Sequence, residues 1–147
     1  MATIRHRVGI KGSVQEVWEA ITNPANIAHW WSSSACGSAQ PGSNLELTFD
    51  GLITLKFAVI EREESRRLHL QNKGGPDAWS ESHLEFELSQ DSIQTFVTLK
   101  HYNPKASEDD FLFFMTKWPI FLVSLKSYIE TGQGWPFPND IKIQANL

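Results

Sequence analysis

The sequence predicts a two-layer α+β domain, in which a curved antiparallel sheet of about six strands surrounds a long C-terminal helix and two short helices follow the first strand. Three observations predict this fold class. Short runs of alternating apolar and polar residues have the period of half-buried strands. Only a few turn-forming residues separate most of these runs, which favours an antiparallel meander. One later segment has the spacing of an amphipathic helix that can cover the apolar face of the sheet.

The N-terminal part predicts the first strand and the two short helices. Residues 4–10 alternate as a strand does. Ser13 is followed three residues later by Glu16, a capping box that predicts the start of a helix. Pro24 then begins a second short helix, because proline is well tolerated at the first helical position. We expect this second helix to carry Trp30.

The central part predicts the remaining strands. Residues 32–44 are small and polar, which is typical of a loop, and residues 135–147 carry too little pattern for an assignment. Between these segments, alternation predicts strands at residues 45–49, 53–59, 68–70, 84–88 and 93–101.

The long helix has its own start and stop signals. A second capping box at residues 107–110 begins it, and Gly132 ends it. Pro119 lies inside the helix and predicts a bend or a break near Trp118. The reason is that proline lacks an amide hydrogen, and its ring clashes with the carbonyl of Met115.

Length and composition exclude several classes of protein. A chain of 147 residues is expected to form one domain over residues 1–147. With 13 Lys+Arg against 17 Asp+Glu, the net charge of −4 makes nucleic acid a poor partner. No apolar run approaches the ~18 residues of a membrane span, and the N-terminus lacks the pattern of a secretory signal. We therefore expect a cytoplasmic protein without a membrane span, in which the lone Cys36 forms no internal disulfide.

Three pieces of sequence carry a family resemblance: Val17-Trp18 with Ile21-Thr22, the Trp30-Trp31 pair, and Trp118 followed by Leu122, Leu125-Lys126 and Tyr128. With them, residues 4–134 resemble the SRPBCC (START-like) superfamily. The chain is most similar to the branch named after activators of the ninety-kilodalton heat-shock chaperone ATPase. The resemblance implies the helix-grip fold and a pocket, because superfamily members bind lipids, sterols, plant hormones or polyketide intermediates. Some members are cyclases or hydroxylase components, so the fold leaves the chemistry open.

A sheet that curls around one helix commonly leaves a cavity, and we expect this one to bind a small hydrophobic or amphipathic ligand. The candidate ligand-binding residues face inward: Phe57, Phe86 and His101 on the sheet, Phe114, Trp118 and Leu122 on the long helix, and Trp30 at the other end. The alternative is that these large side chains only pack against one another. The Trp30-Trp31 pair has the same two interpretations, since one ring can cap the core or lie at the mouth of the pocket.

Two further classes of function stay open. His101 is either a buried histidine bonded to backbone or a polar anchor for a ligand. A cyclase- or hydrolase-type enzyme would use His101 and a nearby carboxylate in the same cavity. A chaperone-linked protein-interaction module would use an exposed aromatic patch instead. Among partners, a second copy of the chain in a homodimer stays open beside the small ligand.

Signals for other chemistry are weak. The sequence has no GxSxG, HExxH or CxxC motif, and its five histidines are dispersed, so we expect neither a metal nor a cofactor. Glu81, His83, Glu85 and Glu87 share the phase opposite the apolar one, which predicts a solvent-facing row rather than an acid–base group. Trp79 is out of phase with the apolar positions after it, so its side of the sheet is not predicted.

Overall fold

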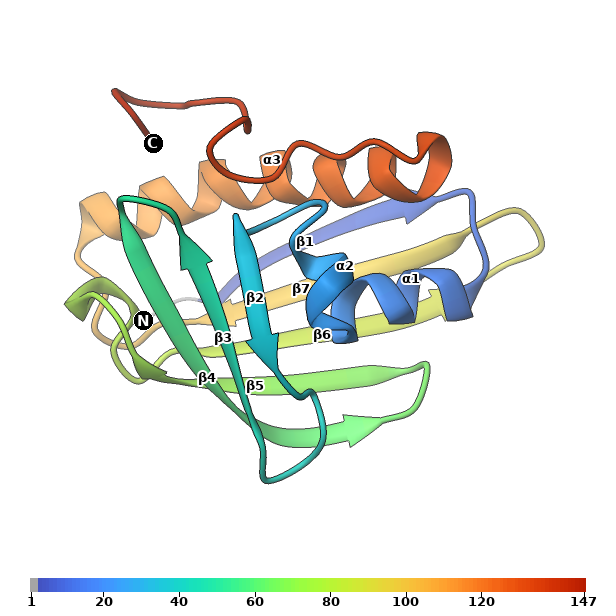
Figure 1. Ribbon diagram of the computed structural model, residues 1–147, viewed down its shortest axis with the longest axis horizontal. Helices are drawn as coiled ribbons and strands as arrows, with labels where there is room; N and C mark the ends of the chain where they lie inside the picture. Colours follow the sequence, from blue (N-terminus) through green and yellow to red (C-terminus); the bar gives the residue numbers. More distant parts are fainter. Residues whose placement is uncertain (1–2) are drawn as a thin grey trace.

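A computed structural model describes residues 3–147 as an antiparallel sheet of seven strands, in the order β1-β7-β6-β5-β4-β3-β2, that curves around a long helix (Figure 1). The elements follow in this order: β1 (Thr3–Ile10), α1 (Val14–Thr22), α2 (Pro24–Ile27), β2 (Ser34–Gly37), β3 (Asn44–Phe49), β4 (Ile53–Glu63), β5 (Arg67–Gly74), the 3-10 helix η1 (Asp77–Trp79), β6 (His83–Gln90), β7 (Thr95–Tyr102) and α3 (Glu108–Thr131). The predicted fold class is confirmed.

The alternating pattern of the strands places one set of side chains on the inner face, which we define as the face toward α3. Buried residues alternate with more exposed ones along β3, β6 and β7, as the sequence predicts. The largest fully buried side chains include Trp18, Trp30, Phe57 and Phe86, so the core lies between the inner face and the helices.

The structure has one strand more than predicted. β2 lies within residues 32–44, the segment expected to be a loop, and pairs antiparallel with β3. Its residues Ser-Ala-Cys-Gly show no apolar alternation and are exposed or half-buried. Backbone hydrogen bonds to β3 define this edge strand, and such bonds leave no side-chain pattern.

Both short helices begin as predicted. The Ser13 hydroxyl accepts a hydrogen bond from the Glu16 amide at 3.1 Å, and the Glu16 carboxylate accepts one from the Ser13 amide at 3.2 Å. Pro24 occupies the first turn of α2. However, α2 ends at Ile27, so Trp30 lies beyond the helix and not on it.

α3 is a single helix from Glu108 to Thr131, and the predicted break at Pro119 is wrong (Figure 1). Proline still removes the amide that would bond to the Met115 carbonyl four residues earlier. In the structure, the His6 side chain on β1 takes over this role, with its Nε2 donating to the Met115 oxygen at 3.0 Å. The sheet therefore supplies the hydrogen bond that the helix lacks.

Within residues 3–147, no helix has both the length and the apolar character needed to cross a membrane.

Candidate ligand-binding groove

A cavity of about 670 Å³ lies between α3, the β3–β4 hairpin, η1 and the C-terminal tail, which we define as residues 135–147. Eight aromatic residues line it: Trp31, Phe49, Trp79, Phe113, Phe114, Trp118, Phe121 and Phe137. Leu52 and Leu112, 47% and 53% exposed, also line it, so the cavity opens to solvent on this side. We call this cavity the groove.

Trp31 lies at the centre of the aromatic wall. Its ring centroid is 5.2 Å from that of Trp118 and 6.3 Å from those of Phe57 and Phe86. The preceding Trp30 is fully buried and stacks against Trp31 at 5.5 Å, while its indole donates to the Ala20 carbonyl at 2.8 Å. Trp30 is thus part of the core, where its indole bonds to α1, and Trp31 faces the groove.

The structure divides the sequence-predicted site residues into two layers. Phe114 and Trp118 line the groove. Four others are buried in the layer behind it and do not line it: Trp30, Phe57, Phe86 and Leu122. The backing layer touches the wall directly, since Phe86 and Phe57 both contact the Trp31 ring.

His101 also lies in the backing layer. It is fully buried on β7, and its Nδ1 accepts a hydrogen bond from the Trp118 indole at 3.0 Å. Trp79 stacks on its ring at 4.9 Å, and Phe114 meets it edge-on at the same distance. Burial lowers the pKa of His101 to about 3, so the imidazole is neutral at physiological pH. Because Nδ1 accepts, the proton of the neutral ring is on Nε2.

His101 does not meet the expectation of a hydrogen bond to backbone. Its hydrogen bond goes to an indole and not to backbone, and it positions Trp118, which reaches the groove. The side chains packed around it are the aromatic rings of Trp79, Phe114 and Trp118, and its burial lowers the pKa of His101. A histidine–carboxylate pair, as the enzyme hypothesis requires, is not among its hydrogen bonds within residues 3–147.

The C-terminal tail forms the outer wall of the groove and runs back along α3 (Figure 1). The Phe137 ring packs edge-on against Phe49 at 5.7 Å, and its amide donates to the Trp31 carbonyl at 2.9 Å. Sequence analysis missed this wall because the tail has no periodic pattern.

An ion cluster fastens the tail to α3. The Lys117 ammonium pairs with Asp140 at 2.5 Å and donates to the Ile141 carbonyl at 2.8 Å, and Lys142 pairs with Asp140 at 2.7 Å. Burial by itself would raise the pKa of Asp140, but hydrogen bonds and attraction from the two lysines outweigh it and hold this pKa below its usual value. The buried carboxylate is thus ionised and paired at neutral pH.

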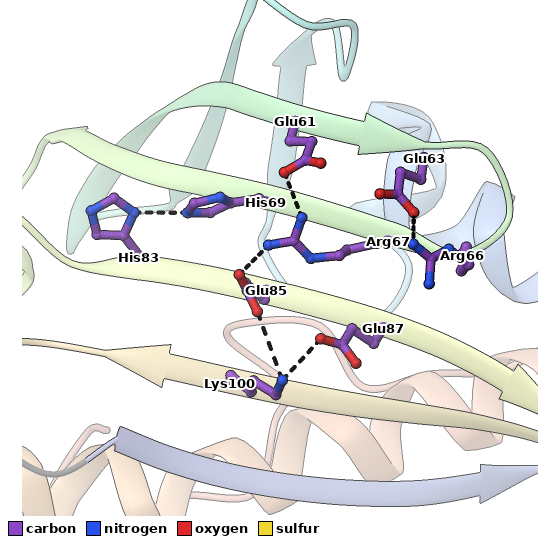
Figure 2. Close-up of polar contacts among 9 residues, drawn as sticks. All are labelled: Glu61, Glu63, Arg66, Arg67, His69, His83, Glu85, Glu87 and Lys100. Atoms are coloured by element: carbon purple, nitrogen blue, oxygen red, sulfur yellow. Dashed lines mark hydrogen bonds and ion pairs between the residues drawn. The ribbon is translucent and has the colours of Figure 1, made fainter.

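The outer face of the sheet carries charged residues away from the groove, as predicted. Figure 2 shows Arg67 between Glu61 and Glu85, with Lys100 joining Glu85 to Glu87.

A histidine pair lies beside these charges. The His69 Nε2 and His83 Nδ1 atoms are 2.8 Å apart (Figure 2). Among the described residues, no group of three or more His, Cys, Asp or Glu side chains is arranged to hold a metal ion.

Fold and cavity together define a class: helix-grip α+β domains with an apolar groove between sheet and C-terminal helix. The chain belongs to the family described as Activator of Hsp90 ATPase homolog 1-like protein, which matches residues 11–130. This family is a branch of the SRPBCC superfamily, so the predicted resemblance is confirmed.

Solved structures agree with this assignment. The Aha1 dimer from Colwellia psychrerythraea is 32% identical, with a TM-score of 0.82 over 91% of this chain and 100% of that one. CalU16 from Micromonospora echinospora is 26% identical, with a TM-score of 0.76 over 92% of this chain and 70% of that one. DynU16, from the dynemicin biosynthetic locus, has the same fold, with 23% identity and a TM-score of 0.82 over 90% of this chain and 48% of its own. A search of curated proteins gave no match.

Proposed function

We propose that the protein binds a small hydrophobic or amphipathic ligand in the groove. The observation that carries the proposal is the cavity of about 670 Å³, which eight aromatic residues help to line and which is open on one side. Ligand pockets commonly have volumes of about 300–1,000 Å³ and mostly apolar walls. Rings that face such a space, and are not fully packed against each other, offer apolar surface to a ligand.

The two layers have different roles in this proposal. Trp31, Phe114 and Trp118 contact the ligand. The backing layer, which includes Phe57, Phe86, Trp30, Leu122 and His101, holds these rings in position. The resemblance to SRPBCC proteins supports the same placement, between sheet and helix.

A probe titration tests the proposal. An uncharged naphthalene probe titrated into the folded protein is expected to bind saturably and to quench tryptophan fluorescence, because Trp31 and Trp118 line the groove. Leu112→Ala at the rim should weaken binding. Ile93→Ala, at a site 71% exposed and outside the groove lining, serves as the matched control and should not weaken it. Flat titrations with naphthalene and fatty-acid probes would contradict the proposal.

We also propose that the chain forms a homodimer. The support is the Aha1 structure from Colwellia psychrerythraea, a dimer 32% identical to this chain and matched over its whole length. Light scattering after size-exclusion chromatography is expected to give twice the 16.7 kDa mass of the chain. A monomer mass at high protein concentration would contradict it.

A further inference from the structure

The inner face of the sheet ends in a row of polar side chains beside His101. The last pair of the β6–β7 register is His83 with Tyr102, so continuing this register places Ser82 opposite Asn103, just beyond the ends of the two strands. Directly opposed residues have Cβ atoms about 4.5–5.5 Å apart, and diagonal neighbours such as Ser82 and His101 remain within reach of long side chains. Ser82, His101 and Asn103 therefore form one cluster, which we call the polar row.

Each residue of the polar row has a buried polar atom without a hydrogen-bond partner in the described part of the chain. These atoms are Ser82 Oγ, His101 Nε2 and Asn103 Oδ1, in residues 0%, 0% and 1% exposed. Buried polar groups in proteins are nearly always hydrogen-bonded. Three such atoms in one cluster are what a polar ligand group requires.

The chemistry of the polar row is neutral. His101 presents an N–H at Nε2, because its Nδ1 accepts from Trp118. Asn103 presents its carbonyl oxygen, since its Nδ2 donates to the Ala78 carbonyl. The Ser82 hydroxyl can donate or accept. One donor, one acceptor and one group of either kind fit a hydroxyl or a carbonyl, whereas a buried ion would lack a counter-charge.

η1 is one of the elements that lie between the polar row and the groove. Trp79 stacks on His101, and the carbonyl of Trp79 accepts from the Ser82 amide at 3.0 Å. Ala78 and Trp79 also line the groove. Trp79 thus contacts His101 on one side and lines the groove on the other, as Phe114 and Trp118 of α3 also do.

We propose that the polar row is an inner subsite of the groove, which receives the hydroxyl or carbonyl end of an amphipathic ligand when Trp79 moves off His101. This inference rests on the proposed function, since the apolar body of the same ligand lies in the groove. It specifies the class of ligand: an uncharged, oxygen-bearing apolar molecule.

Matched probes test the inference. 2-Naphthalenemethanol and 2-ethylnaphthalene have similar apolar bodies, but only the first carries a hydroxyl. The alcohol is expected to bind about tenfold more tightly, the effect of one added hydrogen bond in a dry site. Ser82→Ala should reduce this preference several-fold while leaving the affinity for 2-ethylnaphthalene unchanged. Ser89→Ala, at an exposed position on β6, is the control and should preserve the preference.

A second measurement uses the parent protein alone, so it does not depend on whether Ser82→Ala folds. The alcohol should shift the ¹⁵N resonance of His101 Nε2, and 2-ethylnaphthalene should not. Equal affinities for the two probes, or a preference unchanged in Ser82→Ala, would overturn the inner subsite and leave the groove intact. Binding of neither probe would overturn the proposed function itself.

Discussion

The hydrogen bond between Trp118 and His101 joins the groove wall to the sheet behind it. It fixes the indole plane of Trp118 on one side and the tautomer of His101 on the other. Both groups are buried, so neither can replace the bond with water without rearrangement. The orientation of the largest ring on α3 therefore depends on one imidazole nitrogen.

Trp118→Phe is expected to lower the free energy of unfolding by about 1–3 kcal/mol, because it leaves His101 Nδ1 buried without a donor while keeping an aromatic ring. Urea denaturation measures the change. Trp135→Phe, at a site 41% exposed, is the control and should stay within about 0.5 kcal/mol of the parent. Equal effects of the two substitutions would show that the hydrogen bond contributes nothing.

His101 also makes stability depend on pH. Its pKa is about 3 in the folded chain, below the ordinary 6.5, so the unfolded chain binds more protons between these values. Stability from this residue is complete above about pH 6.5 and falls as pH decreases toward 3, at up to about 1.4 kcal/mol per pH unit.

The expected result is a stability difference between pH 7 and pH 5 that is smaller in His101→Phe than in the parent, as measured by urea denaturation at each pH. Parallel pH profiles for the two proteins would contradict the assignment to His101.

At the scale of elements, α3 and β1 share a hydrogen bond that substitutes for one the helix has lost. His6 donates to the Met115 carbonyl, which Pro119 leaves without its helical partner. This explains why a proline in the middle of a 24-residue helix does not break it.

A double-mutant cycle tests the explanation. His6→Ala is expected to cost about 0.5–1.5 kcal/mol of stability in the parent. In a Pro119→Ala background it should cost less, because the alanine amide can bond to Met115 again. Thermal or urea unfolding of the four proteins gives the coupling energy, and a coupling of zero would refute the explanation.

The strands and helices also show which parts of the structure the sequence patterns can predict. Alternation placed Phe86 and His101 on the inner face, because the period of two is imposed by the backbone of a strand. The groove wall was harder to predict. Trp31 follows the end of α2, where no helical phase applies, and β2 is held by backbone bonds that leave no side-chain signal. The effect of Pro119 depended on His6, more than a hundred residues away in the chain.

At the scale of the whole molecule, the groove has one side formed by the core and one formed by the tail. The tail is fastened through Asp140, whose carboxylate lies between Lys117 and Lys142. Breaking a buried ion pair by removing one partner leaves an uncompensated charge, which is more costly than replacing both partners. Loss of this ion cluster, which we call the clamp, is therefore expected to free the tail from α3 and so to open the outer wall of the groove.

Asp140→Asn is expected to speed amide exchange of the tail by at least about tenfold, with the Phe137 amide as the reporter because it bonds to Trp31. Hydrogen–deuterium exchange measures this. Glu81→Gln removes an exposed ion-pair partner of Lys105 and should leave the tail unchanged. Unaltered exchange in Asp140→Asn would show that packing of Phe137 holds the tail without the clamp.

The uneven origin of the two walls has a consequence for the diversity of such grooves. In residues 135–147 the apolar side chains are exposed or only partly buried, and of these only Phe137 packs against the core. Yet Phe137, Ile143 and Leu147 help to set the width of the groove. Varying Ile143 and Leu147 while keeping Phe137 and the buried Asp140 is thus a route to new ligand preferences at little cost in folding, because these two residues line the groove without packing against the core.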